Sequence, residues 1–145
     1  MTIAPTKEQL SAFAQHSPDE PVQMLNLLRF RAQAEYPEGS EHSACSGAQA
    51  YARYGEKMLA LLKQAGGTVE VLAECHAPVI GESGDRFDHM VIVRYPNRQA
   101  FLQMVDSDTY KKVVVHRTAA VEHSLLIPMS HVETPLGSHK NKDQA

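Results

Sequence analysis

The chain has 145 residues, a hydrophobic fraction of 43% and a formal net charge of −3 at pH 7. This length fits one domain with its own hydrophobic core, and the charge provides no basic surface for nucleic acid. The apolar runs are too short to span a membrane, so we expect neither a nucleic-acid nor a membrane partner. Two separate cysteines, Cys45 and Cys75, and the lack of a signal-peptide pattern indicate a reducing, cytoplasmic location.

Two helices and two strands are predicted in the first half of the chain. Capping boxes start helices over residues 6–15 and 46–65. The boxes pair Thr6 with Gln9 and Ser46 with Gln49. The apolar segment 22–30 predicts the first strand. Apolar and polar residues alternate over 68–80, which predicts a second strand in a sheet with one wetter face.

The second half repeats this order of elements. Residues 89–95 predict a strand, and Asn97 is expected to cap a short helix. Residues 106–108 separate this helix from a second one. Residues 125–127 form the last short strand, which Pro128 is expected to stop. Two strand–helix–strand halves predict a ferredoxin-like βαββαβ fold of the α+β class with an antiparallel sheet.

A single α+β domain is expected over residues 1–137, followed by a polar, disordered tail over residues 138–145. A four-stranded sheet with helices on one face leaves its other face bare. Because a large exposed apolar face promotes aggregation unless it is covered, we predict a homodimer. Its two sheets would face each other and form a closed barrel.

A candidate pocket is predicted where the inner side of the helices meets the sheet. It consists of Asn26, Tyr51, Tyr54, His116 and Arg117. A guanidinium binds a carboxylate through two hydrogen bonds, and an imidazole moves a proton near neutral pH. The pocket would therefore suit a small apolar carbonyl or carboxylate compound. Alternatively, the tyrosines are core residues with solvated hydroxyls, and Arg117 pairs with Glu122 or Asp108.

The segment 32–45 is long for a connection inside a compact domain. It is rich in Pro, Gly, Ser and charged residues, so it cannot form a core of its own. Tyr36 is the one large apolar group in its middle. We predict that the segment is either a lid, with Tyr36 folding toward the pocket or the partner subunit, or a solvated excursion.

The sequence predicts no metal site and no cofactor. It contains eight histidines, but none has the spacing of a metal-binding motif. His116 is the candidate axial ligand if haem were bound. Cys75 and His76 are neighbours in a strand and point to opposite faces, which argues against a nucleophile–base pair.

Four segments of the chain resemble a known protein family. They are MLNLLRF, SGAQAYARYG, VRYPNRQAFLQMVDSDTY and HRTAAVEHSLLI, spread over residues 22–129. They are similar to the family catalogued as domain of unknown function 1330, and residues 95–110 are the most specific part. The resemblance implies the dimeric α+β barrel superfamily, whose members include cofactor-independent monooxygenases, haem proteins and isomerases.

Two functions remain open from the sequence. The first is a cofactor-independent enzyme, in which His116 transfers protons, Arg117 holds an anion and Asn26 orients a carbonyl. The second is a non-catalytic dimeric module that binds a small molecule in the same pocket. One fold hosts many functions, so the sequence does not choose between them.

Overall fold

The computed structural model describes residues 3–137. Its elements are α1 (Lys7–Gln15), β1 (Val22–Phe30), α2 (Gly47–Ala65), β2 (Thr68–Glu74), the 3₁₀ turn η1 (Ser83–Asp85), β3 (His89–Tyr95), α3 (Arg98–Asp106), α4 (Asp108–Ala120) and β4 (Val121–Met129). Both predicted capping boxes are present, at Thr6 and Ser46. The predicted tail over residues 138–145 lies outside the described residues.

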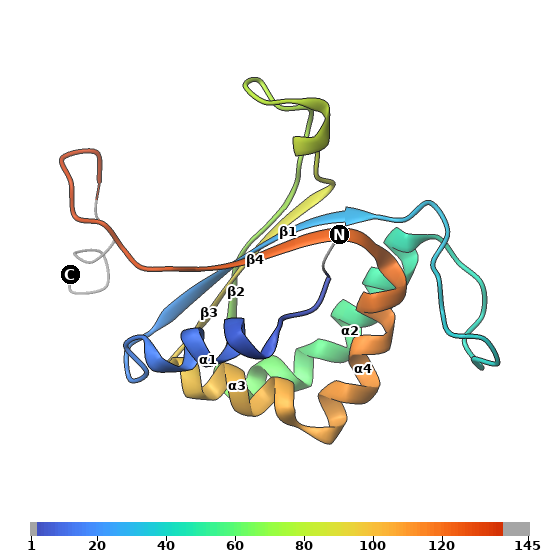
Figure 1. The fold of residues 1–145 in the computed structure, drawn as a ribbon, viewed down its shortest axis with the longest axis horizontal. Helices are drawn as coiled ribbons and strands as arrows, with labels where there is room; N and C mark the ends of the chain where they lie inside the picture. Colours follow the sequence, from blue (N-terminus) through green and yellow to red (C-terminus); the bar gives the residue numbers. More distant parts are fainter. Residues whose placement is uncertain (1–2, 138–145) are drawn as a thin grey trace.

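The four strands form one antiparallel sheet in the order β2-β3-β1-β4. The described helices gather on one side of this sheet, and the other side carries none (Figure 1). This arrangement confirms the predicted α+β architecture of two strand–helix–strand halves.

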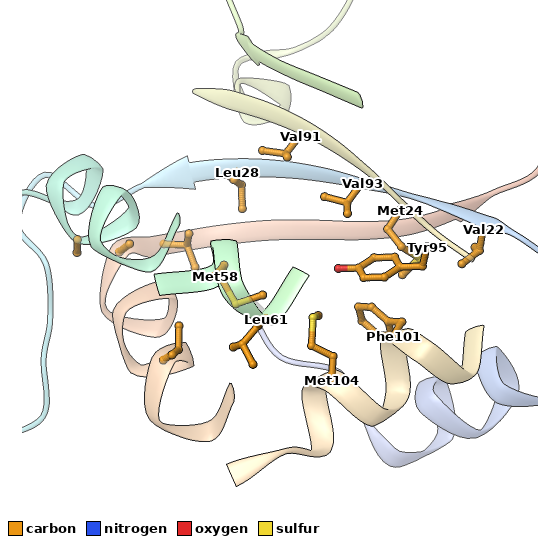
Figure 2. Close-up of a cluster of buried hydrophobic side chains, with 14 residues drawn as sticks. Val22, Met24, Leu28, Met58, Leu61, Val91, Val93, Tyr95, Phe101 and Met104 are labelled. Atoms are coloured by element: carbon orange, nitrogen blue, oxygen red, sulfur yellow. The ribbon is translucent and has the colours of Figure 1, made fainter. Parts of the chain in front are cut away.

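The hydrophobic core lies between the sheet and the helices. Figure 2 shows side chains from the two central strands facing side chains from two helices. The strand residues are Val22, Met24 and Leu28 of β1 and Val91, Val93 and Tyr95 of β3. The helix residues are Met58 and Leu61 of α2 and Phe101 and Met104 of α3. Leu28 and Val121 are fully buried. The core therefore fixes the positions of α2 and α3 against the two central strands.

The structure corrects two strand predictions. The last strand is longer than residues 125–127, because β4 pairs with β1 from Val121 to Met129 and includes Pro128. Proline is tolerated there because β4 is an edge strand, where one side of the backbone has no ladder partner. The second strand ends at Glu74, not at residue 80, because its partner β3 begins at His89, opposite Glu74.

A bulge in β2 also changes which residues share a face. The register shifts between Val69 and Val71, so Val69 pairs with Val93 and Val71 with Ile92. Val93 and Ile92 are adjacent and point to opposite sides of the sheet. Val69 and Val71 therefore point to opposite sides of the sheet, and the alternation predicted over 68–80 is interrupted between them.

The bare side of the sheet is largely apolar. Because side chains alternate along a strand and the buried residues of β1 face the helices, the residues between them face the bare side. These are Leu25 and Leu27 on β1, Met90 and Ile92 on β3, and Leu125 and Ile127 on β4. Leu125 and Ile127 remain 38% and 42% exposed in the single chain.

The start of α2 is held against β1 and α4 by close backbone contacts. The amide of Arg31 donates to the carbonyl of Ala120 at 2.8 Å, and the amide of Gly47 donates to the carbonyl of Arg31 at 3.1 Å. A Cβ on Gly47 would lie 2.2 Å from the carbonyl oxygen of Arg31. Only glycine allows this approach, which sets α2 and α4 side by side above the sheet.

Candidate functional site

Polar side chains gather in two groups around α2 and α4. We call the first the inner cluster; it consists of Tyr51, Tyr54, Tyr95, Tyr110 and Arg117. Figure 2 shows Tyr95 pointing from β3 into the space between sheet and helices. The rings of Tyr51 and Tyr54 lie 5.4 Å apart. The predicted residues Tyr51, Tyr54 and Arg117 thus come together, and Tyr95 and Tyr110 join them.

Burial controls the titration of these phenols. It raises the pKa of Tyr51 and, more strongly, that of Tyr54, and the neighbouring Tyr110 raises both further. Burial also raises the pKa of Tyr95. The charge of Arg117 acts in the opposite direction on Tyr51 and Tyr54 but is outweighed. The three hydroxyls therefore keep their protons at neutral pH and can donate hydrogen bonds.

Arg117 has neutral hydrogen-bond partners. Its Nη1 donates to the main-chain carbonyl of Ile3 at 3.0 Å, and its Nη2 donates to Oγ of Ser124 at 3.2 Å. Among residues 3–137 no carboxylate lies within 4.0 Å of its guanidinium. Glu122, one of the partners considered from the sequence, lies instead 3.8 Å from Nε of Arg29. The inner cluster thus contains a half-buried cation that this part of the chain does not neutralise.

Asn26 lies on the helix-facing side of β1, between Met24 and Leu28. Its side-chain nitrogen donates to the carbonyl of Val91 at 3.3 Å and is 3.5 Å from that of Met24. These bonds direct the amide nitrogen of Asn26 to main-chain carbonyls within the sheet.

His116 belongs to the second group, which we call the outer cluster: Tyr36, His42, Arg53 and His116. The hydroxyl of Tyr36 lies 2.7 Å from Nδ1 of His116, and Nη1 of Arg53 donates to the same hydroxyl at 3.2 Å. The rings of His42 and His116 are 4.5 Å apart. His116 is only 2% exposed, because the 32–45 segment covers it.

The outer cluster favours neutral imidazole at His116. Burial lowers the pKa of His116, and the electrostatic influence of the nearby His42, Lys57 and Arg53 lowers it further. A neutral imidazole can accept the hydroxyl proton of Tyr36 at Nδ1. Since Arg53 also donates to that oxygen, the phenol is placed between a donor and an acceptor.

The helix geometry explains why one predicted pocket becomes two clusters. His116 and Arg117 are consecutive residues, so their side chains leave α4 about 100° apart. Arg117 points toward Ser124 on the sheet, whereas His116 meets the loop. The loop is anchored there by hydrogen bonds from Ala34 to Cys45 and from Glu35 to Ala119. Tyr36 thus covers His116 and also packs against the edge of the core.

Sequence reasoning missed four residues of these clusters: His42, Arg53, Tyr95 and Tyr110. Arg53 lies between Tyr51 and Tyr54, off the apolar stripe of α2, so helical spacing places it away from the core. The position of Arg53 on the outer side of α2, next to the long loop that contains Tyr36, is the one feature of the sequence that could have indicated its role.

Both cysteines are free thiols. Among residues 3–137 no group of three histidine, cysteine or acidic side chains is placed to hold a metal ion.

The antiparallel sheet with helices on one face defines a ferredoxin-like α+β protein. The sequence profile of the family described as "Domain of unknown function (DUF1330)" matches residues 41–130. The chain belongs to this family, as its sequence segments predicted. No curated protein matches the chain. No helix among the described residues is long and apolar enough to cross a membrane.

The chain is also similar to several solved structures. The crystal structure of RPA0582, a protein of unknown function from Rhodopseudomonas palustris, shares 36% identity and has a TM-score of 0.82, covering 91% of this chain and 98% of that one. Two other structures are more distant, and each is 15% identical to this chain. For a hydroxynitrile lyase from Passiflora edulis the TM-score is 0.51, and the match covers 81% of this chain and 98% of that one. For a dabb family protein with a ferredoxin-like fold from Mesorhizobium loti the TM-score is 0.50, and the match covers 78% of this chain and 98% of that one. These two show the fold alone.

Proposed function

We propose that this protein binds a small apolar carboxylate or carbonyl compound at the inner cluster. The observation that carries this proposal is Arg117, a half-buried guanidinium with no carboxylate partner among the described residues. A charge removed from water is unfavourable unless it is paired. A carboxylate ligand would supply the missing charge through two parallel hydrogen bonds.

The surroundings of Arg117 favour a ligand with an apolar body. The ring of Tyr51 lies tilted against that of Tyr54 and 5.3 Å from the ring of Phe30, so the walls are aromatic. Buried tyrosines offer an apolar body with one polar atom. Because their raised pKa keeps Tyr51 and Tyr54 protonated, they would donate to a second oxygen of the ligand. Few polar groups in an apolar setting are typical of small-molecule sites.

Substitution of Arg117 tests the proposal. Isothermal titration with a panel of short aliphatic and aromatic carboxylates should find at least one ligand for the natural protein. Arg117→Gln should weaken that ligand by at least about tenfold, because a charge-assisted hydrogen bond contributes roughly 1.5–3 kcal/mol. Lys111→Gln, an exposed change on the same helix, is the matched control. The proposal would be refuted if Arg117→Gln bound the ligand as tightly as the natural protein does. It would also be refuted if the natural protein bound the corresponding neutral amide as tightly as the carboxylate.

A second candidate function is cofactor-independent proton transfer at the outer cluster. It is favoured by the 2.7 Å contact between Tyr36 and neutral His116 and by the bond from Arg53 to the same hydroxyl. As Tyr36 gives its proton to Nδ1 of His116, its oxygen could take a proton from a carbon next to a carbonyl. The products would be an enolate and an imidazolium, with no cofactor involved.

Deuterium exchange separates this candidate from simple binding. Small ketones and 2-oxo acids incubated with protein in heavy water should lose the NMR signal of the protons next to the carbonyl. Tyr36→Phe should abolish the acceleration, since it keeps the ring and removes the exchanging oxygen. Binding without exchange would leave the non-catalytic module as the function.

We also propose that the protein is a homodimer formed through the bare side of the sheet. The support is the apolar surface of β1, β3 and β4, which includes the partly exposed Leu125 and Ile127. Covering it with a second copy removes this surface from water. Neither cluster lies on this face, so the second copy would cover neither of them.

We infer a cytoplasmic location from the thiols. Cys45 and Cys75 are both free and only partly buried. Free thiols persist in a reducing compartment. Fractionation of the native host, followed by immunodetection, tests this inference directly.

A further inference from the structure

The short segment before α1 fills the space beside the inner cluster. We call residues Ile3, Ala4 and Pro5 the strap. Figure 1 shows it leaving α1 and rising toward β4. Ile3 is half-buried and packs against the hydrophobic core, whereas Ala4 and Pro5 are exposed. The carbonyl of Ile3 receives the hydrogen bond from Nη1 of Arg117. One residue therefore supplies both an oxygen for the guanidinium and a branched aliphatic group for the core.

These two contacts of Ile3 are the ones that the proposed ligand would make. A small apolar carboxylate would also place an acceptor oxygen against Arg117 and a short apolar chain against the core. The peptide carbonyl is neutral, however, so it forms a weaker hydrogen bond with the guanidinium than a carboxylate does. The strap thus satisfies the hydrogen bonding of Arg117 without neutralising its charge.

The strap is also lightly attached. α1, which follows it, has no buried residue. It is fixed mainly through Phe13, whose ring lies 5.3 Å from that of Phe101 and whose carbonyl accepts from Arg98 at 3.1 Å. Two surface hollows among the described residues lie between α1 and α3 and beside the start of α2, and Arg117 lines neither. With the strap in place, the carbonyl of Ile3 occupies one donor of the half-buried guanidinium.

We propose that the strap is a built-in competitor that occupies the Arg117 site until a branched, short-chain aliphatic carboxylate displaces it. This proposal rests on the proposed binding function and names its ligand class. The compound 3-methylpentanoate has the carbon skeleton of Ile3 from side chain to carbonyl, with a carboxylate in place of the peptide carbonyl. It can make both contacts of Ile3 and also neutralise Arg117.

The test compares the affinity of the full chain and of a variant lacking residues 2–4 for 3-methylpentanoate. Where a site is mostly occupied by its own chain, removing that segment tightens binding in proportion to the fraction that was closed. Deletion should therefore tighten binding by at least about tenfold. Ile3→Gly should have a smaller effect in the same direction. Ala12→Ser, an exposed change on α1, is the control and should bind like the natural chain.

A second readout follows the strap itself. On titration of the full chain with 3-methylpentanoate, the NMR signals of the Ile3 methyl groups should move to the positions of an unstructured isoleucine. Equal affinity of the full and shortened chains, or Ile3 signals that stay fixed while the ligand binds, overturns the strap proposal and leaves the binding function standing. If 3-methylpentanoate binds neither form, the strap proposal is overturned, and if no carboxylate of the panel binds either form, the binding function is overturned as well.

Discussion

Two glycines of α2 provide a sharp test of the packing. Gly47→Ala places a Cβ 2.2 Å from the carbonyl oxygen of Arg31, 2.7 Å from that of Ala120 and 2.8 Å from the amide nitrogen of Arg31. All three are main-chain atoms, so relief requires β1, α2 and α4 to move apart. Gly55→Ala, on the same helix, meets nothing within 4 Å. The same substitution should therefore have opposite effects at the two positions.

The magnitudes follow from the two environments. Overpacking costs about 1–3 kcal/mol in ordinary cores. We expect about 3 kcal/mol or more for Gly47→Ala because only backbone can give way. Gly55→Ala should stabilise the fold by about 0.5–1 kcal/mol, the difference in helix propensity. At roughly 2–4 °C per kcal/mol for a chain near this size, Tm should fall by at least about 6 °C and rise by up to about 4 °C, respectively.

Urea unfolding followed by circular dichroism, together with thermal melts, measures both variants. The slope of the urea transition should stay unchanged, since the same surface is exposed on unfolding. If Gly47→Ala were within about 0.5 kcal/mol of the natural protein, the range of an ordinary surface change, the close approach of the three elements would be incorrect.

The other two predictions concern pH and assembly. Because the pKa of His116 is lowered in the folded chain, the unfolded chain gains a proton first as pH falls below about 6.5. Stability should therefore decrease with acidification, and the decrease between about pH 7.5 and pH 5.5 should be smaller in His116→Gln. An equal decrease would show that His116 titrates normally. For assembly, light scattering should give about twice the 16.0 kDa chain mass. Ile92→Lys, on the bare sheet face, should give a monomer, whereas the exposed control Leu59→Lys should not. A natural protein that stays monomeric would contradict the dimer.

Much of the fold could be predicted because its signals are local. Asn97 caps α3, and Ser46 with Gln49 starts α2, as their sequence patterns indicated. The strand ends could not be predicted in the same way, because they depend on pairing. β4 extends to Met129 because β1 offers partners as far as Gln23, and β2 stops at Glu74 because β3 begins opposite it.

The candidate site was predictable only in part. Helical spacing placed Tyr51, Tyr54 and Arg117 toward the sheet, where the structure brings them together. The direction of His116 depends on where the 32–45 segment folds, which no periodic pattern encodes. The roles proposed for Asn26, Tyr36 and His116 remain predictions that the experiments above address.

The strand order has a consequence for folding. In the order β2-β3-β1-β4, neither the first half of the chain, with β1 and β2, nor the second, with β3 and β4, contains two adjacent strands. Neither half can therefore close a hydrogen-bonded ladder by itself, and the β2–β3 hairpin spans their junction. The sheet forms when the halves dock, so unfolding should be a single cooperative transition. Fragments cut between β2 and β3 should each stay unfolded and regain structure only when mixed.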